Sequence, residues 1–216
     1  MFSGIVQGKG RILSFRDQEY KKETFNGKRV KILWGSVDGS DVKKGDSISV
    51  NGVCLTVIYC DEKAFEVDIS EETFSRTCNL KNPGVVNLEK AAKFSDRIGG
   101  HFVTGHIDGT AKVISVTPVE NSWKIISLIP KIYSKYLTEK GSIAINGVSL
   151  TINSLKDTEL GCLISINIIP HTWENTTFSE LEKGSVINFE IDLIARTLAR
   201  LMQNFKIDKG SRNEQK

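Results

Sequence analysis

The sequence contains no apolar run of the length, about 18 residues, that a transmembrane helix requires. Its opening also lacks the basic segment followed by an apolar stretch that marks a signal peptide. The four cysteines form no Cys-x-x-Cys pair and show no regular spacing, which favours reduced thiols. These absences predict a soluble protein of the cytoplasm that binds no membrane.

An excess of charge of one sign is also missing. Lys and Arg number 29 against 26 Asp and Glu, which leaves a formal net charge of +3. A nucleic-acid binder usually concentrates basic residues on one face, so we expect no nucleic-acid partner. The 216 residues, 39% apolar and 25% charged, are typical of a globular chain with one ample domain or two small ones.

Metal and phosphate motifs are absent too. The chain has three histidines, and no His-Glu-x-x-His motif or Cys/His cluster. His101 and His106 would face opposite sides of a strand, so we expect them to share no metal. The glycine-rich opening GIVQGKG lacks the Lys-Ser/Thr of a phosphate loop.

What the sequence does contain is an internal repeat. Four blocks recur in the same order, each displaced by about a hundred residues. The pairs are FSGIVQG (2–8) with VTGHIDG (103–109), KKGDSISVNGVCLTV (43–57) with EKGSIAINGVSLTI (139–152), DISEETFSRT (68–77) with NIIPHTWENT (167–176), and GVVNLE (84–89) with SVINFE (185–190). Two long units exclude a solenoid and predict two copies of one domain.

Each copy is rich in strands. Alternating β-branched stretches are separated by Gly-containing turns, and the Asn51-Gly52 and Asn146-Gly147 dipeptides suit tight turns. Several short strands in fewer than a hundred residues predict a small closed barrel. Short helical turns are expected near 70–76 and 131–138, and a hinge near 94–100.

The last segment predicts a helix. Apolar residues between 193 and 205 fall on one helical face, and Asp192 is a plausible N-cap. This face could pack on its own barrel or against copies of itself, and the pattern favours neither. The polar residues after Lys206 predict a frayed tail.

The two copies differ where chemistry would be expected. Cys54 stands at the place of Ser149, and Ile5 at the place of His106. A single cysteine or histidine is more often structural than functional. The residues alone therefore predict a double barrel with two related, unequal pockets and a terminal helix.

An ordered set of motifs resembles the riboflavin synthase family. The motifs are MFSGIVQG, GDSISVNGVCLTV, DISEETFSRTCNL, AAKFSDRIGGHFVTGHIDGT, KGSIAINGVSLTI, IPHTWENTTF and INFEIDLIAR, and the match covers roughly residues 1–202. The resemblance implies an all-β fold of two pseudo-symmetric six-stranded Greek-key barrels with a C-terminal helix. The implied divisions are two lumazine-binding barrels, a trimerisation helix and a flexible tail, at 1–97, 98–191, 192–206 and 207–216.

The resemblance also implies a reaction. It is the dismutation of two molecules of 6,7-dimethyl-8-ribityllumazine to riboflavin and 5-amino-6-ribitylaminouracil, a transferase reaction that ends riboflavin biosynthesis and needs no cofactor or metal. The family is homotrimeric, and each working site joins the first barrel of one subunit to the second barrel of its neighbour. Some relatives also associate with lumazine synthase.

Site residues carried over from the family fall into two groups. The resemblance places in the first pocket, besides Phe2 at its edge, Gly4, Val6, Ser47, Cys54, Thr56, Ala64 and Thr73. It places in the second pocket His106, Ser149, Thr151, Ile169, Thr172 and Asp192, and it adds Gly105 as a substrate-binding residue.

Four of these residues are candidates for catalysis, and a fifth, Thr151, would assist one of them. His106 is the expected proton-transfer group, because imidazole changes charge near neutral pH. Cys54 and Ser47 would assist addition or hold the acceptor, and Ser149, with Thr151, would hydrogen-bond the ring as negative charge develops.

Three other functions are compatible with a double barrel. A non-catalytic lumazine or flavin antenna protein would have the same fold but would lose the polar pocket groups, which are present here. A flavin-binding reductase barrel would need an α/β nucleotide-binding partner domain, and a second barrel stands in its place. A pure scaffold would not need the pocket residues at all.

Overall fold

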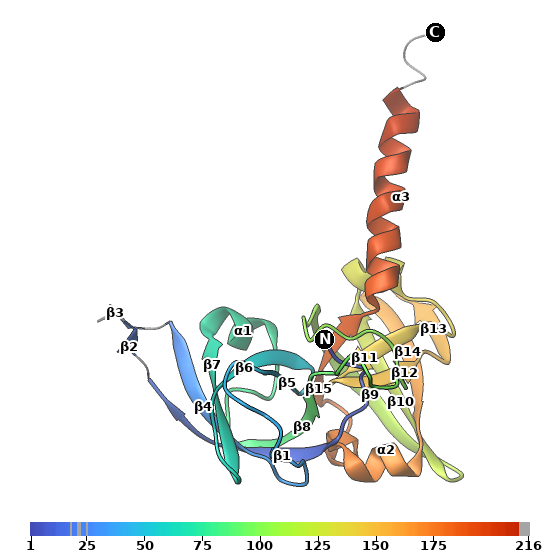
Figure 1. The fold of residues 1–216 in the computed structure, drawn as a ribbon. Coiled ribbons are helices and arrows are strands. Elements are labelled where there is room, and N and C mark those ends of the chain that lie inside the picture. Colours follow the sequence, from blue (N-terminus) through green and yellow to red (C-terminus); the bar gives the residue numbers. More distant parts are fainter. Residues whose placement is uncertain (18, 21–22, 25, 212–216) are drawn as a thin grey trace.

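The first half of the chain closes into a six-stranded barrel in the computed structural model, which describes residues 1–17, 19–20, 23–24 and 26–211. Its strands run in the order β1-β4-β7-β6-β5-β8, all antiparallel (Figure 1). They are β1 (Gly8–Arg16), β4 (Gly27–Leu33), β5 (Ser47–Val50), β6 (Val53–Cys60), β7 (Ala64–Ser70) and β8 (Gly84–Lys90), with β2 (Glu19–Tyr20) and β3 (Glu23–Thr24) pairing outside the barrel.

The second half forms a curled seven-stranded sheet in the order β12-β11-β15-β9-β10-β14-β13. Its strands are β9 (Gly109–Val119), β10 (Ser122–Pro130), β11 (Ser142–Ile145), β12 (Val148–Thr151), β13 (Ser154–Asp157), β14 (Gly161–Ile168) and β15 (Val186–Ile191). The predicted all-β fold with two related units is therefore confirmed, but this second unit is not a closed six-stranded barrel.

The difference has a local cause. In the first unit β6 pairs with both neighbours and closes the barrel, although its register shifts between Val57 and Tyr59. At the matching place in the second unit the strand stops after Thr151 and resumes at Ser154. One strand thus becomes two, β12 and β13, and the sheet opens between them.

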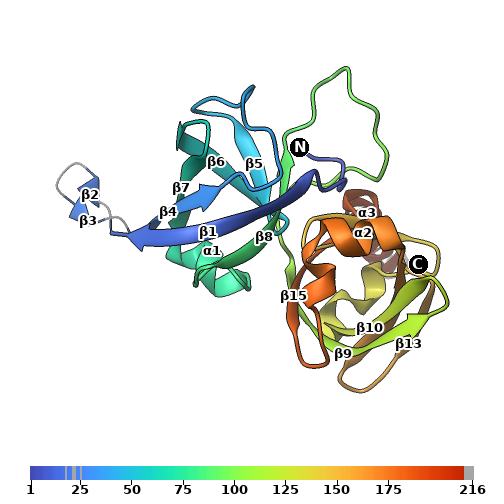
Figure 2. The same cartoon turned by 90° about the horizontal axis from the view of Figure 1, so that it is seen from below.

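Each unit has a core of its own. In β6 the side chains of Val53, Leu55 and Val57 are buried while Cys54 and Thr56 are not, which is the alternation of a strand with one face in the core. The buried cluster of the first unit contains no residue of the second. The two units lie beside each other in Figure 2. Two independent cores agree with the internal repeat.

Short helices appear where they were expected. α1 (Glu71–Arg76) and the 3₁₀ helix η1 (Lys131–Tyr136) confirm the two predicted helical turns. The second repeat adds α2 (Pro170–Asn175) and the 3₁₀ helix η2 (Thr177–Glu180).

Two Asn-Gly turns meet between the units. Asn51 and Asn146 have φ of 47° and 45°, and the following glycines have φ of 85° and 83°, as two-residue hairpin turns require. A Cβ added to Gly52 would lie 2.7 Å from the backbone nitrogen of Gly147. The predicted tight turns are therefore confirmed, and they lie close against each other at the boundary between the two units.

Four buried asparagines join the units at these turns. Asn51 Oδ1 accepts from the backbone N–H of Asn87, and Asn146 Oδ1 accepts from that of Asn188, each at 2.8 Å. The Asn87 side chain then donates to the Asn146 carbonyl at 2.9 Å, and the Asn188 side chain donates to the Asn51 carbonyl at 3.0 Å. Two bonds therefore run within a unit and two run across, in pseudo-twofold fashion.

The C-terminal helix α3 (Leu193–Ser211) projects away from both units (Figure 1). Asp192 Oδ1 accepts from the backbone N–H of Ile194, which confirms the predicted N-cap, and Arg196 pairs with Asp108 at 2.6 Å. The helix runs to Ser211, so the predicted end at Lys206 is wrong, and residues 212–216 of the predicted tail lie outside the described part.

The apolar face of α3 is exposed rather than packed on the barrel. Large apolar side chains on it are 37–60% accessible: Leu193, Ile194, Leu198, Leu201 and Met202. The first alternative left by the sequence, packing of this face on the chain's own barrel, is therefore not what the structure shows. No helix in the described residues has the length and apolar character needed to cross a membrane.

Replacing Asn188 by Ala should destabilise the fold by about 3 kcal/mol, because it leaves the backbone N–H of Cys78 and the carbonyl of Asn51 without their hydrogen-bond partner in a buried site. Chemical denaturation followed by circular dichroism measures this loss. The same substitution at the exposed Asn153 is the control and should change the free energy of unfolding by less than about 0.5 kcal/mol. Equal effects of the two substitutions would contradict the role of the network.

Candidate functional site

Each unit carries a polar wall on the outer face of one hairpin. In the first unit Ser47 pairs with Thr56 and Ser49 pairs with Cys54 across β5 and β6. In the second unit the same register pairs Ser142 with Thr151 and Ala144 with Ser149, across β11 and β12. The predicted residues Ser47, Cys54 and Thr56 therefore share one face, and Ser149 and Thr151 share its counterpart.

The glycine loops are exchanged between the units. The backbone N–H of Ser149 donates to the Gly4 carbonyl at 2.7 Å, and that of Cys54 donates to the Gly105 carbonyl at 2.9 Å. Val6, two residues after Gly4, packs against the core of the second unit. The N-terminal segment therefore belongs to the second wall, and the loop of Gly105 belongs to the first.

This exchange corrects the predicted grouping. Gly4 and Val6 were assigned to the first pocket and His106 to the second, whereas hydrogen bonds and packing put the Gly4 loop at the second wall and the Gly105 loop at the first. The physical reason is that each loop crosses the boundary between the units before the first strand of its own unit, β1 or β9, begins. Phe2, which is 1% exposed, forms the bridge with Val103 at this crossing.

A buried glutamate carboxylate in each unit accepts hydrogen bonds from the backbone of one glycine loop. Glu89 accepts from the backbone N–H groups of Ser3 and Gly4 at 2.7 and 3.1 Å. Glu190 accepts in the same way from Thr104 and Gly105 at 2.7 and 2.9 Å. Burial raises the pKa of Glu89, while its hydrogen bonds from Ser3 and Gly4 act in the opposite direction.

The starts of α1 and α2 carry three more of the predicted residues, Thr73, Ile169 and Thr172. Ser70 caps α1, and its Oγ accepts from the backbone N–H of Thr73 and lies 3.0 Å from the Thr73 hydroxyl. In the second unit Ile169 occupies the corresponding cap of α2, and the half-buried Thr172 lies in that helix. The predicted residues Thr73, Ile169 and Thr172 are thus in matching places.

Ala64 does not belong with them. It starts β7 opposite Leu33 and is 2% exposed, at the other end of the strand from Ser70. The repeat offers Ser70 instead, since DISEETFSRT aligned on NIIPHTWENT puts Ser70 over Ile169. The internal alignment could therefore have corrected this assignment, which came from the family resemblance alone.

The histidines separate into two environments. His106 follows Gly105 in the first-wall loop and is exposed. His101 is half-buried, and its Nδ1 lies 2.7 Å from the Ser149 hydroxyl oxygen. Both lie in a loop, so the assumption that they share a strand was wrong. His101 was considered only as a metal ligand, and no sequence signal places it beside Ser149.

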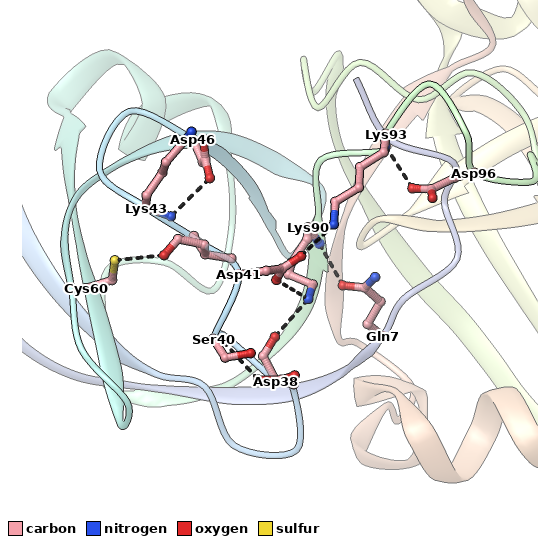
Figure 3. Close-up of polar contacts among 11 residues, drawn as sticks. Gln7, Asp38, Ser40, Asp41, Lys43, Asp46, Cys60, Lys90, Lys93 and Asp96 are labelled. Atoms are coloured by element: carbon pink, nitrogen blue, oxygen red, sulfur yellow. Dashed lines mark hydrogen bonds and ion pairs between the residues drawn. The ribbon is translucent and has the colours of Figure 1, made fainter.

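A charged cavity opens at one end of the first wall. Ser47 lines a cavity of about 340 Å³ together with the Lys90, Asp41 and Lys93 side chains. The Asp41 carboxylate binds the Lys90 ammonium at 2.7 Å and the Lys93 ammonium at 2.8 Å, and Lys90 also donates to the Asp38 carbonyl (Figure 3). These lysine hydrogen bonds lower the pKa of Asp41 to about 2.

Asp192, the remaining predicted residue, lies at the start of α3 in the second unit.

No cluster that could hold a metal is present in the part of the chain described here. Within it, no three His, Cys, Asp or Glu side chains are grouped as ligands. All four cysteines are free thiols. The walls therefore offer hydrogen-bonding and proton-transfer groups.

Comparison with known proteins gives the site a chemical context. A family model described as a lumazine binding domain matches the chain twice, at residues 3–91 and 104–192. Riboflavin synthase of Actinobacillus pleuropneumoniae is 38% identical over 99% of this chain and 95% of that protein. Riboflavin synthase of Bacillus subtilis is 38% identical over 97% and 93%.

Solved structures agree with these sequence matches. The crystal structure of LumP complexed with riboflavin superposes with a TM-score of 0.75 at 32% identity, covering 88% of this chain and 99% of that one. LumP complexed with 6,7-dimethyl-8-(1'-D-ribityl) lumazine gives a TM-score of 0.73 at 31% identity, with the same coverage.

Gly105→Ala should destabilise the protein by roughly 2 kcal/mol or more, because φ is +81° and the new Cβ would lie 2.5 Å from that of Cys54. Thermal and denaturant unfolding measure the effect. Gly84→Ala is the matched control, since nothing lies within 4 Å of a Cβ added there. A Gly105→Ala protein as stable as the control would contradict the close contact between the Gly105 loop and Cys54.

Proposed function

Since the chain belongs to the riboflavin synthase family, we propose that it catalyses the dismutation of two 6,7-dimethyl-8-ribityllumazine molecules to riboflavin and 5-amino-6-ribitylaminouracil. One lumazine gives up a four-carbon unit and leaves as the pyrimidine, and the other accepts the unit and becomes riboflavin. Two matched polar walls in one chain support this proposal, because the reaction consumes two copies of one substrate.

Holding both substrates is the main contribution expected of the protein. Two bound rings in a fixed relation replace an encounter of dilute molecules, which is worth on the order of 7–11 kcal/mol when the orientation is good. The walls are well fixed for this task, because each is clamped by a glycine loop that a buried carboxylate holds in turn.

The groups for proton transfer and addition lie mainly around the first wall. His106 is the proposed proton-transfer group, since it is exposed and its loop is fixed against Cys54. Cys54 and Ser47 would assist addition to the bound ring. Ser149 and Thr151 on the second wall would donate hydrogen bonds as negative charge develops.

The remaining predicted residues would shape the two sites. Thr56 and Thr73 would complete the first wall, and Ile169 and Thr172 the second; Ser70, which was not predicted, would join Thr73 in place of Ala64. Phe2 and Asp192 would fix the borders of the sites, at the loop crossing and at the base of α3.

A non-catalytic lumazine or flavin carrier is the second candidate. The similarity to ligand-bound LumP structures favours it. Turnover separates the two, because a carrier binds lumazine without converting it.

Incubation of the purified protein with 6,7-dimethyl-8-ribityllumazine alone should give one riboflavin and one pyrimidine for every two lumazines, measured by chromatography and absorbance. His106→Ala should lower kcat by about a hundredfold or more if the imidazole transfers the proton. Binding with no riboflavin formed would instead support the carrier. An unaffected kcat in His106→Ala would remove that residue from proton transfer.

We further propose that the chain is a homotrimer in which α3 brings three copies together, with each working site formed between two subunits. The exposed apolar face of α3 supports this assembly. A cytoplasmic location and an association with lumazine synthase stay predictions from the sequence and the resemblance.

Leu198→Glu should convert the trimer to smaller species and abolish most turnover, because a charge enters the apolar face of α3. Light scattering coupled to size exclusion measures the mass. Arg200→Glu places the same residue on the opposite side of the helix and should leave the trimer intact. A Leu198→Glu protein that stays trimeric would contradict assembly through this face.

A further inference from the structure

His101 is a half-buried titratable group to which the proposed reaction assigns no role. Its imidazole approaches Ser149 closely, with Nδ1 2.7 Å from the hydroxyl oxygen. Gly100 makes the approach feasible, because a Cβ at that position would lie 2.6 Å from the Ser149 Cβ. The chain therefore brings the imidazole to this hydroxyl through a position that only glycine can fill.

The backbone fixes both partners on one segment. The His101 N–H donates to the Ser3 carbonyl at 3.2 Å, and the Ser149 N–H donates to the neighbouring Gly4 carbonyl at 2.7 Å. Glu89 of the first unit holds the N–H groups of Ser3 and Gly4. The N-terminal segment that hydrogen-bonds the second wall therefore also fixes the backbone positions of His101 and Ser149.

The other ring nitrogen indicates where the proton lies. Among the described residues, His101 Nε2 has no hydrogen-bond partner and is buried. A buried N–H without a partner is rarer in proteins than a buried acceptor without one, so the proton belongs on Nδ1. Burial lowers the pKa of His101, while Asp192 and Glu190 favour its charged form. Burial thus opposes the charged form of the ring, and the geometry at Nδ1 and Nε2 favours the Nδ1–H tautomer of the neutral imidazole.

We propose that His101 is a positioning residue that donates Nδ1–H to the Ser149 oxygen and so turns the single hydroxyl proton of Ser149 toward the bound lumazine. A serine hydroxyl has one proton and two acceptor sites, and a donor on one acceptor leaves the proton free for another partner. The Ser149 hydroxyl would then already direct its proton at the ring when negative charge develops there. This inference rests on the proposed function, since it specifies how the second wall stabilises the reacting lumazine.

The matching place on the first wall has different chemistry. Cys54 replaces Ser149 there, and a thiol is a much weaker hydrogen-bond donor than a hydroxyl. The oriented donor therefore distinguishes the second wall from the first. The two bound lumazines, although identical, would meet unequal stabilisation.

Steady-state kinetics of four variants test the proposal. His101→Leu should lower kcat by about tenfold or more with little change in KM, because the lost orientation matters most in the transition state. His101→Asn, whose amide can donate from nearly the place of Nδ1, should stay within about threefold of the parent kcat. Adding His101→Leu to Ser149→Ala should lower kcat no further than Ser149→Ala alone.

Ser127→Ala controls for disturbance of the second unit. Ser127 is fully buried in β10, and its hydroxyl is unpaired within the described residues, so its removal should leave kcat unchanged. Equal losses of kcat in His101→Leu and His101→Asn would overturn the proposal. So would a further loss when His101→Leu is added to Ser149→Ala.

A spectroscopic readout separates this inference from the proposed function. Long-range ¹H–¹⁵N spectra of histidine-labelled protein report which ring nitrogen carries the proton, and only three histidines need assignment. We expect His101 as the Nδ1–H form in the parent protein. An Nε2–H form would overturn the inference even in an active enzyme, whereas an Nδ1–H form in a protein without turnover would refute only the proposed function.

Discussion

The structure depends on a ring of four buried asparagine side chains that joins the two units. Buried amides are costly unless each donor and acceptor is paired, and here the turn asparagines and the strand asparagines satisfy backbone groups within and across the units. Because the pairing is directional, it fixes the relative orientation of the units more strictly than apolar contact would. Everything proposed for the walls presupposes that orientation.

The orientation of the two units decides which wall each glycine loop contacts. The Gly4 loop reaches the second wall and the Gly105 loop reaches the first, so neither wall is complete within its own repeat. Each of the two repeated units thus supplies a loop to the wall of the other. The repeats differ at Cys54 and Ser149, so the two walls are chemically unequal.

The sequence predicted the repeated β units and their turns well, because these follow from local patterns. Alternating burial in β6, the Asn-Gly turns and the Asp192 cap are all decided by residues near in sequence. The opening of the second sheet at 152–153 was not predictable, because a register shift in one copy becomes a strand break in the other through small packing differences.

The site was predicted as a set of residues but not as an arrangement. Ser47, Cys54, Thr56, Ser149 and Thr151 lie on two walls as expected, since cross-strand register follows from the turn. The exchange of the loops and the place of His101 depend on long-range contacts that no local pattern encodes. Ala64 shows the complementary error, in which a residue carried over from a family was not checked against the internal repeat.

The central claim is that each unit of one chain holds one lumazine. It is tested most directly by calorimetric titration with a lumazine analogue that carries oxygen in place of the reactive methyl group and therefore cannot turn over. The account predicts two analogues bound per chain. A stoichiometry of one would contradict it, because one of the two polar walls would then bind no ligand.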